Sequence, residues 1–167
     1  IAGDTPLFKI LPIRQKKAGI VTTGNEVYYG RIQDAFGPVI KKKLEEYGVE
    51  IMGQTIMNDD VLNIAKAIQE FINKGAEMVV CTGGMSVDPD DTTPTAIIST
   101  GAVLVSYGAP VLPGAMFLLA YTKNEIPILG LPGCVMYAKR TVFDLVLPRI
   151  LADEKLTAKD ISLLGVG

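Results

Sequence analysis

The segment richest in groups that could do chemistry runs from Thr82 to Pro94. Two adjacent glycines, Gly83 and Gly84, follow a short apolar run, so the backbone can turn there with its amides exposed and a ligand can approach closely. Ser86 adds a hydroxyl donor. These groups suit a phosphate, although the same pattern is also typical of a plain turn that binds nothing.

Three aspartates lie within residues 88–91, directly after these glycines. A Mg²⁺ ion held by one or two carboxylates beside a phosphate is a chemistry that this spacing allows. Helix capping and solvation before Thr93 and Pro94 would explain the same residues without a metal. Asp59 and Asp60 are ambiguous in the same way, because carboxylates at the start of a helix favour its dipole.

Composition excludes several classes of function. The 167 residues contain no histidine, which excludes imidazole catalysis and zinc sites that contain histidine. Cys81 and Cys134 lack CxxC spacing, so we expect no zinc knuckle or redox pair and a reduced, cytoplasmic setting. The net charge of -2 gives no basic field for nucleic acid, and glycines and prolines interrupt the most apolar stretch, so we expect neither a nucleic-acid nor a membrane partner.

Alternating strand and helix patterns predict how these residues are positioned. Strands are expected at 18–23, 49–56 and 78–81, and amphipathic helices from Gly37 to Gly48 and from Asp60 to Gly75. This order is typical of a parallel sheet covered on both faces, which binds ligands outside the carboxyl ends of its strands. The loops at 22–26, 57–60 and 82–91 should therefore converge on one crevice.

The second half of the chain is unusually free of charge. No charged side chain occurs between Asp91 and Lys123, so this stretch is either core on both faces or partly a subunit interface. Strands are expected at 102–105 and 115–121, followed by a hairpin turn at Lys123 and a return strand at 127–131. A last helix should open at Pro132-Gly133, with Val135, Ala138, Val142 and Leu145 facing inward, and Pro148 should disrupt it.

Three parts of the chain are distinguished. Residues 1–17 are expected to form an arm or linker from a preceding region, residues 18–151 the domain, and residues 152–167 a C-terminal extension. The sequence opens with Ile1 rather than Met, and a capping box at Thr157-Ala158-Lys159-Asp160 starts a helix that stops at Gly167. The chain is therefore expected to be a fragment cut from a longer protein.

Six motifs occur together and in a fixed order. They are Thr22-Thr23-Gly24-Asn25-Glu26, Gly30 with Asp34 and Gly37-Pro38, Asn58-Asp59-Asp60, the loop from Thr82 to Pro94, Pro113-Gly114, and Leu131-Pro132-Gly133. Over residues 18–151 the chain resembles the molybdenum-cofactor biosynthesis domain, the molybdopterin-binding fold of the molybdopterin adenylyltransferases, the molybdenum insertases and gephyrin.

The resemblance implies a three-layer α/β domain with a mostly parallel central sheet and an antiparallel hairpin, assembled as a homo-oligomer, either a trimer or a dimer. It implies molybdopterin as the ligand, with Mg²⁺ and ATP or AMP as further partners. Asp59 and Asp91 would be the catalytic and metal-binding acids. The residues implied in cofactor binding are Thr22, Thr23, Gly24, Glu26, Thr82, Gly83, Gly84, Met85, Ser86, Pro132 and Gly133.

Departures from the family pattern leave the activity open. Asn25 stands where the insertases carry an acid, and Ala115-Met116 stands where they place Lys-Pro. The leading hypothesis is molybdopterin binding in molybdenum-cofactor assembly, with adenylyl transfer or molybdate insertion if the domain is catalytic. The alternatives are a non-catalytic molybdopterin sensor or carrier, and a nucleotide pyrophosphate hydrolase of the competence-damage-inducible type.

Overall fold

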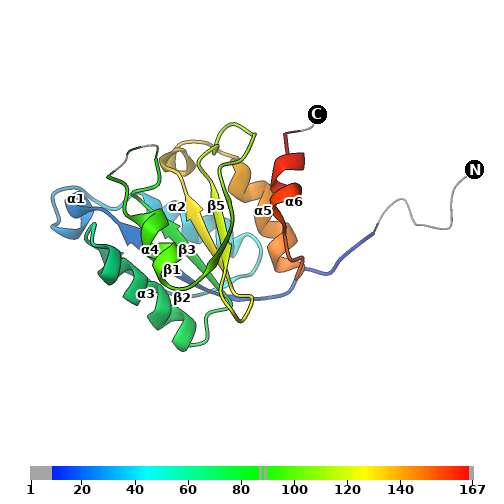
Figure 1. Cartoon of the computed structure of the whole chain (residues 1–167), viewed down its shortest axis with the longest axis horizontal. Coiled ribbons are helices and arrows are strands. Elements are labelled where there is room, and N and C mark those ends of the chain that lie inside the picture. Colours follow the sequence, from blue (N-terminus) through cyan, green and yellow to red (C-terminus); the bar gives the residue numbers. More distant parts are fainter. Residues whose placement is uncertain (1–8, 87, 89, 166–167) are drawn as a thin grey trace, which may run out of the picture.

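A computed structural model describes residues 9–86, 88 and 90–165. One mixed sheet of six strands lies between two layers of helices (Figure 1), in the strand order β2-β1-β3-β6-β5-β4. The strands are β1 (Lys17–Thr23), β2 (Glu50–Met57), β3 (Met78–Thr82), β4 (Val103–Tyr107), β5 (Leu118–Tyr121) and β6 (Pro127–Leu131). This arrangement confirms the predicted three-layer α/β domain.

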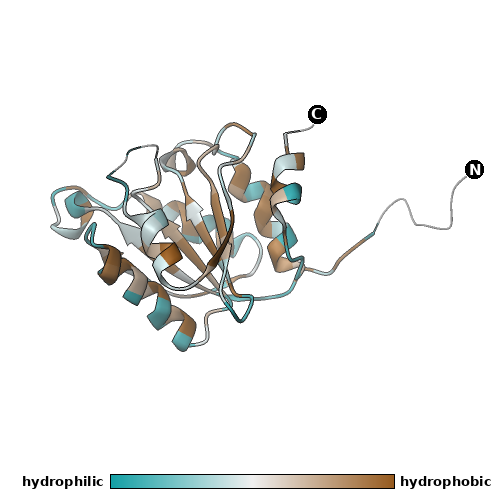
Figure 2. Ribbon diagram, viewed as in Figure 1, coloured by the Kyte–Doolittle hydropathy of each residue, from teal (hydrophilic) through white to brown (hydrophobic). Residues whose placement is uncertain are grey.

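The helices divide between the two faces of the sheet. They are α1 (Asn25–Tyr28), α2 (Phe36–Glu45), α3 (Val61–Asn73), α4 (Thr93–Ser99), η1 (a 3₁₀ turn, Gly133–Met136), α5 (Val142–Leu151) and α6 (Ala158–Leu163). Side chains of α2, α5 and α6 join one core cluster, and those of α3 and α4 join the other. The strands between them are strongly hydrophobic (Figure 2), as expected for a sheet buried on both faces.

Strand directions define where two neighbouring connections leave the sheet on opposite faces. Strands β2, β1, β3 and β6 run parallel, and β5 pairs antiparallel with both β6 and β4. The chain leaves β1 toward the layer of α2 but leaves β3 toward the layer of α4. Such a switch between adjacent strands separates the two connections, and open α/β sheets generally bind ligands at the carboxyl ends of the strands on either side of it.

Local capping explains where two helices begin. The Asp34 carboxylate accepts hydrogen bonds from the backbone amides of Phe36 and Gly37 at the start of α2. Asp60 accepts one from the amide of Asn63 at the start of α3. Both acids therefore have a structural function, and for Asp60 this is the capping interpretation that the sequence left open beside a ligand-binding one.

The expected helix from Pro132-Gly133 to Pro148 is wrong. Only the short turn η1 follows Gly133, and α5 begins at Val142 because Thr141 and Asp144 form a capping box. The helix then passes Pro148 and ends at Leu151, since its apolar face remains buried in the core and offsets the one hydrogen bond that proline removes. Leu145, expected inward, is 48% exposed because the helix is phased from Thr141.

The uncharged stretch forms the other edge of the sheet. Among the described residues β4 pairs with β5 alone, and Val103 on β4 is 70% exposed. The predicted strands at 102–105 and 115–121 are shifted or shortened, because β4 runs to Tyr107 and β5 begins only at Leu118. In the described part of the chain, no helix is long and apolar enough to cross a membrane.

Candidate functional site

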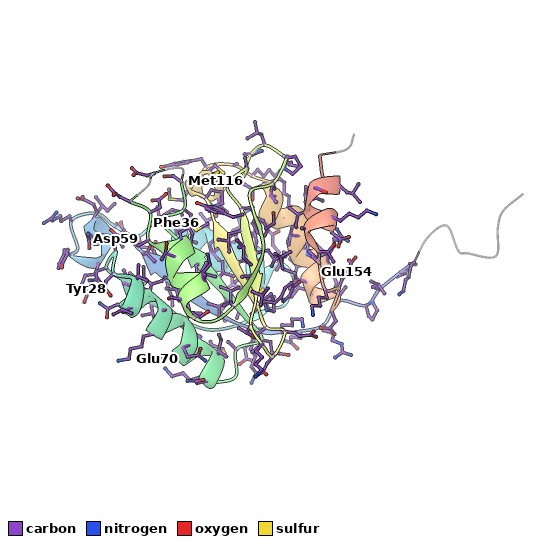
Figure 3. The ribbon with its side chains drawn as sticks, viewed as in Figure 1. Tyr28, Phe36, Asp59, Glu70, Met116 and Glu154 are labelled. Atoms are coloured by element: carbon purple, nitrogen blue, oxygen red, sulfur yellow. The ribbon has the colours of Figure 1, made fainter. Side chains whose placement is uncertain are left out.

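The loops that follow β1 and β2 are tied to each other at the carboxyl edge of the sheet. The backbone amide of Asn25 donates to Asp59 Oδ2 at 2.9 Å, and the amide of Asp59 donates to Asn25 Oδ1 at 3.2 Å. Asp59 lies at this end of the domain, just before α3 (Figure 3). Asn25 therefore has a positioning function toward Asp59 that an aspartate could also perform.

The loop after β3 packs directly against the end of β1. Gly83 has φ +86°, and a Cβ there would lie 2.1 Å from the carbonyl oxygen of Thr23, so only glycine fits. The hydroxyls of Thr23 and Thr93 lie 2.9 Å apart and connect β1 to the start of α4. The structure thus brings together the three loops that the sequence predicted to converge, with Thr23 at their centre.

Thr22 and Thr82 lie beneath these loops, fully buried between β1, β2 and β3. Gln54 of β2 donates from Nε2 to Thr22 Oγ1 at 2.9 Å and to Asp34 at 2.6 Å, and Thr82 Oγ1 donates to Thr22 Oγ1 at 3.3 Å. These threonines support the loops from inside. Sequence reasoning missed Gln54, whose only signal was a side-chain amide within a mostly apolar strand.

Asp91 occupies donors that the sequence assigned to a phosphate. Its Oδ2 accepts from the backbone amide of Ser86 at 2.6 Å and from the Ser86 hydroxyl at 2.8 Å. Tyr107 on the edge strand β4 donates to the Ser86 carbonyl at 3.0 Å. Partial burial, and then the charge of Asp91, raise the pKa of Tyr107. A ligand phosphate must displace Asp91 or bind to the neighbouring donors.

Thr92 supplies a donor of that kind. Its hydroxyl oxygen is the one buried side-chain nitrogen or oxygen without a hydrogen-bond partner in the described part of the chain. Its backbone nitrogen would lie 3.6 Å from a Cβ built on Gly84. Because burying an unpaired hydroxyl costs about 1–3 kcal/mol, an unpaired hydroxyl on a residue whose backbone adjoins the glycine loop calls for an explanation. The sequence indicated Thr92 only as part of a helix start.

Other predicted cofactor residues differ in what they can offer a ligand. The Met85 side chain is 3% exposed and packs against Gly130 of β6, so only its backbone could face a ligand. Glu26 lies 3.5 Å from Arg31 in an exposed ion pair within its own loop. Pro132 and Gly133 follow β6 at the same edge of the sheet, beside β3.

Asp59 and Asp91 stand on separate loops. Among the residues that the structure describes, no three His, Cys, Asp or Glu side chains are grouped to hold a metal ion. Neither aspartate forms an ion pair with a described residue. Each carboxylate has the ligand chemistry that Mg²⁺ accepts, since this ion is usually held by one or two carboxylates together with substrate oxygens and water.

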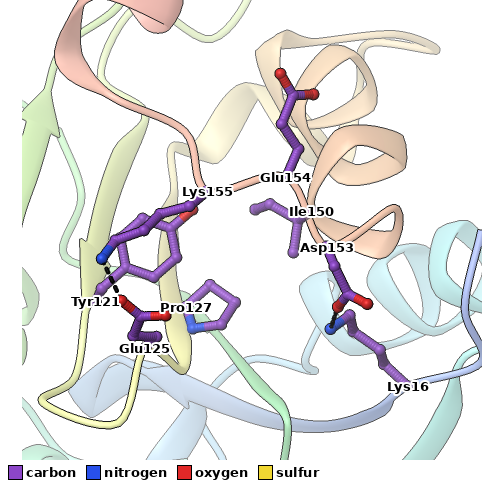
Figure 4. A pocket seen from close by; sticks show the side chains of 8 residues that line it. All are labelled: Lys16, Tyr121, Glu125, Pro127, Ile150, Asp153, Glu154 and Lys155. Atoms are coloured by element: carbon purple, nitrogen blue, oxygen red, sulfur yellow. Dashed lines mark hydrogen bonds and ion pairs between the residues drawn. The ribbon is translucent and has the colours of Figure 1, made fainter. Parts of the chain in front are cut away.

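A cavity at the opposite end of the sheet has a different character. It measures about 240 Å³ and lies at the amino ends of β1 and β6 (Figure 4). Lys16 pairs with Asp153 there, and Lys155 pairs with Glu125. Since each of these charges has an internal partner, the cavity offers little to an ionic ligand.

Comparison with known proteins places the domain in a family. A family model described as a probable molybdopterin binding domain matches residues 19–152. A CinA-like protein of Mycobacterium avium is 42% identical over 77 residues, which are 46% of this chain. That match spans only 18% of the length of the mycobacterial relative.

Solved structures with low sequence identity share the fold. MoaB, a molybdopterin biosynthesis enzyme of Thermus thermophilus, has a TM-score of 0.68 at 19% identity and covers 83% of this chain and 98% of its own. CinA of Thermoplasma acidophilum has a TM-score of 0.67 at 17% identity, with coverages of 82% and 98%. These likenesses show the fold, and the family match over residues 19–152 confirms the predicted resemblance: the chain belongs to the molybdopterin-binding domain family.

Proposed function

We propose that this domain binds molybdopterin at the carboxyl ends of β1 and β3. The terminal phosphate would lie on residues 82–86, and the pterin would extend toward Pro132-Gly133. The observation that carries the proposal is the buried, unpaired hydroxyl of Thr92, a residue whose backbone nitrogen lies near Gly84 at the switch point of the sheet. A phosphate oxygen accepting from this hydroxyl would satisfy it, and loop amides would supply further donors.

Thr92→Val tests the phosphate position. Valine keeps the shape but removes the hydroxyl, so stability should be unchanged or slightly higher while molybdopterin affinity falls about tenfold, the worth of one hydrogen bond to a charged group. Thr95→Val, on the exposed side of the same helix, is the matched control. Anaerobic titration followed by pterin absorbance, with urea unfolding in parallel, gives both quantities. Equal affinities of the two variants would exclude Thr92 from the site.

If the domain is catalytic, the chemistry needs no protein nucleophile. In adenylyl transfer, a pterin phosphate oxygen attacks the α-phosphorus of ATP and pyrophosphate leaves. Mg²⁺, when bound, would neutralise charge on the phosphates, and Asp59 and Asp91 would hold it. The protein would then contribute positioning and electrostatic stabilisation.

Asp91→Asn separates an enzyme from a carrier. An asparagine oxygen can still accept from Ser86, so the loop should keep its shape while the charge is lost. We expect Mg²⁺-dependent turnover to be abolished and molybdopterin affinity to be retained, with Asp90→Asn as the control of equal charge. Turnover of Asp91→Asn at the wild-type level would exclude a metal-binding function for Asp91. If the wild-type protein binds molybdopterin tightly but shows no turnover, the domain is a carrier. The neutral Asn25 beside Asp59 supports this alternative, because it stands where the insertases carry an acid.

A second candidate follows from the CinA-like relatives. The identity of 42% to the Mycobacterium avium protein favours a nucleotide pyrophosphate hydrolase of the competence-damage-inducible type. Such a domain would cleave ADP-ribose with a divalent metal and would not require a pterin. Assaying ADP-ribose cleavage with Mg²⁺ and Mn²⁺, alongside the pterin titration, distinguishes the two candidates.

We further propose that copies of the domain associate through the edge strand β4. The strand is uncharged, and the exposed Val103, Leu104 and Tyr107 lie on it. Val103→Lys should weaken this association, because a charge on an edge strand opposes pairing. Light scattering during size-exclusion chromatography would measure the change, and a monomeric wild type would refute the proposal.

A further inference from the structure

A second cavity, of about 310 Å³, lies between α2 and the segment that follows β6. One face of α2 and its end contribute Val39, Lys42, Lys43 and Glu46, and the segment contributes residues 135–140. The proposed molybdopterin site does not use these α2 residues. The cavity falls in the size range of small-molecule sites, which begins at about 300 Å³.

The lining of this cavity is strongly basic. Lys42, Lys43, Lys139 and Arg140 surround it, against the single acid Glu46. The whole chain has 16 basic and 18 acidic residues, so a quarter of its cations gather here in a protein that is net negative. Clustered cations of this kind are usually only a solvated surface, so a binding site requires further evidence that the side chains around the cavity are fixed in place.

A buried ion pair organises it. Lys43 is 7% exposed, and its Nζ donates to the carbonyl of Lys139 at 2.9 Å and to the two carboxylate oxygens of Asp144 at 2.7 and 2.8 Å. Burial opposes ionisation of Asp144, but hydrogen bonds from Lys43 and the Thr141 backbone outweigh it, and its pKa is lowered. Lys43 thus fixes the segment after β6 against α2 and is itself neutralised.

The positive charge left over lies at the rim. Arg140 is shared between Asp144 at 3.2 Å and Glu46 at 3.6 Å. Lys42 and Lys139 form no ion pair with any residue that the structure describes. An anion entering the cavity would therefore meet two ammonium groups that have no carboxylate of their own.

The inner wall of the cavity is apolar. Val39, Val135, Met136 and Ala138 contribute to it, and Val135 also belongs to the main core cluster. A simple oxyanion would leave this wall uncovered, whereas a ligand with an organic part would bury it. We propose that the cavity is a second binding site, specific for an organic phosphomonoester. Its phosphate binds at Lys42, Lys139 and Arg140, and its organic part lies on Val39 and Met136.

Methyl NMR tests this site separately from the proposed molybdopterin site. Met136 lines the cavity, and Met85 lies under the glycine loop, so ¹³C-methyl methionine labelling reports on each. Phenyl phosphate should shift the Met136 signal, while any shift of Met85 would report separately on phosphate binding at residues 82–86. It should also bind more tightly than inorganic phosphate, because only the aryl ester covers the apolar wall. A silent Met136, or equal affinity for the two ligands, would overturn the proposal whatever the outcome at Met85.

The double variant Lys42→Gln, Lys139→Gln keeps the Lys43–Asp144 pair and should fold normally. We expect it to weaken phenyl phosphate binding at Met136 by at least tenfold, since two hydrogen bonds from charged groups are lost. Lys74→Gln, Lys159→Gln removes the same charge from exposed positions elsewhere and should leave binding unchanged. An equal loss in both double variants would show that only overall charge matters and would refute a built site.

Discussion

The two ends of the sheet hold acidic residues in different ways. At the amino end, Asp153 and Glu125 each pair with a lysine, Lys16 and Lys155 respectively. Those carboxylates are neutralised within the protein itself. An exposed pair of this kind contributes little to stability and leaves little charge for a ligand.

At the carboxyl end the acids are held by neutral donors. Asp59 accepts from the amide of Asn25, and Asp91 accepts from the amide and hydroxyl of Ser86. Such bonds fix the position of a carboxylate but leave its full charge. Residue type alone therefore does not identify a metal site: a fixed carboxylate without a cation beside it is available to a metal ion, whereas a carboxylate paired with lysine must first lose that partner.

The largest expected effect concerns the loop that carries Ser86 and Asp91, and two glycines with almost the same backbone angle test whether this loop is held against β1. Gly83 at the carboxyl end has φ +86°, and Gly101, which follows α4, has φ +84°. A Cβ on Gly83 would clash with the Thr23 carbonyl, whereas a Cβ on Gly101 meets nothing within 4 Å. Gly83→Ala should cost about 3 kcal/mol and Gly101→Ala about 1 kcal/mol in the free energy of unfolding. Urea denaturation measures both, and equal costs would mean that the loop is not packed against β1.

The stability of the protein at low pH should depend on Asp160, whose carboxylate is paired within the protein. Hydrogen bonds from the Thr157 side chain and backbone, then from Arg149, lower the pKa of Asp160 to about 2. Its contribution is therefore complete above the unfolded value of about 4 and is lost as the pH falls toward 2. Asp160→Asn should be about 1 kcal/mol less stable than wild type at pH 7, with the difference closing by pH 2. A constant difference across the titration would contradict the assignment.

The smallest expected effect is the contribution of the Lys155–Glu125 ion pair to stability, which high salt should remove. Lys155 and Glu125 are both mostly exposed, so Lys155→Gln should destabilise the protein by no more than about 0.5 kcal/mol at low salt. In about 1 M NaCl the difference should vanish, because a Debye length near 3 Å screens the pair. A loss that persists at high salt would show that Lys155 acts through packing rather than charge.

The order of elements, the pairing of layers and the meeting of three loops followed from sequence because they depend on local patterns and one topological rule. The phase of α5 did not, since the capping box at Thr141 competed with a misleading Pro-Gly start at residue 132. The Asp91–Ser86 bonds and the Gln54–Thr22 contact depend on how the loops and strands close in space. No periodicity in the sequence encodes such contacts.

The segment beyond α5 has a practical implication for anyone producing this domain. Leu156 and Ile161 are almost fully buried in the main core, and the amide of Leu156 donates to the Tyr121 hydroxyl at 3.0 Å. The family match ends at residue 152, short of both. A protein trimmed to that limit would lose both side chains from the core and expose hydrophobic surface beside β4 and Tyr121, so we expect it to be poorly soluble even where the sheet still forms.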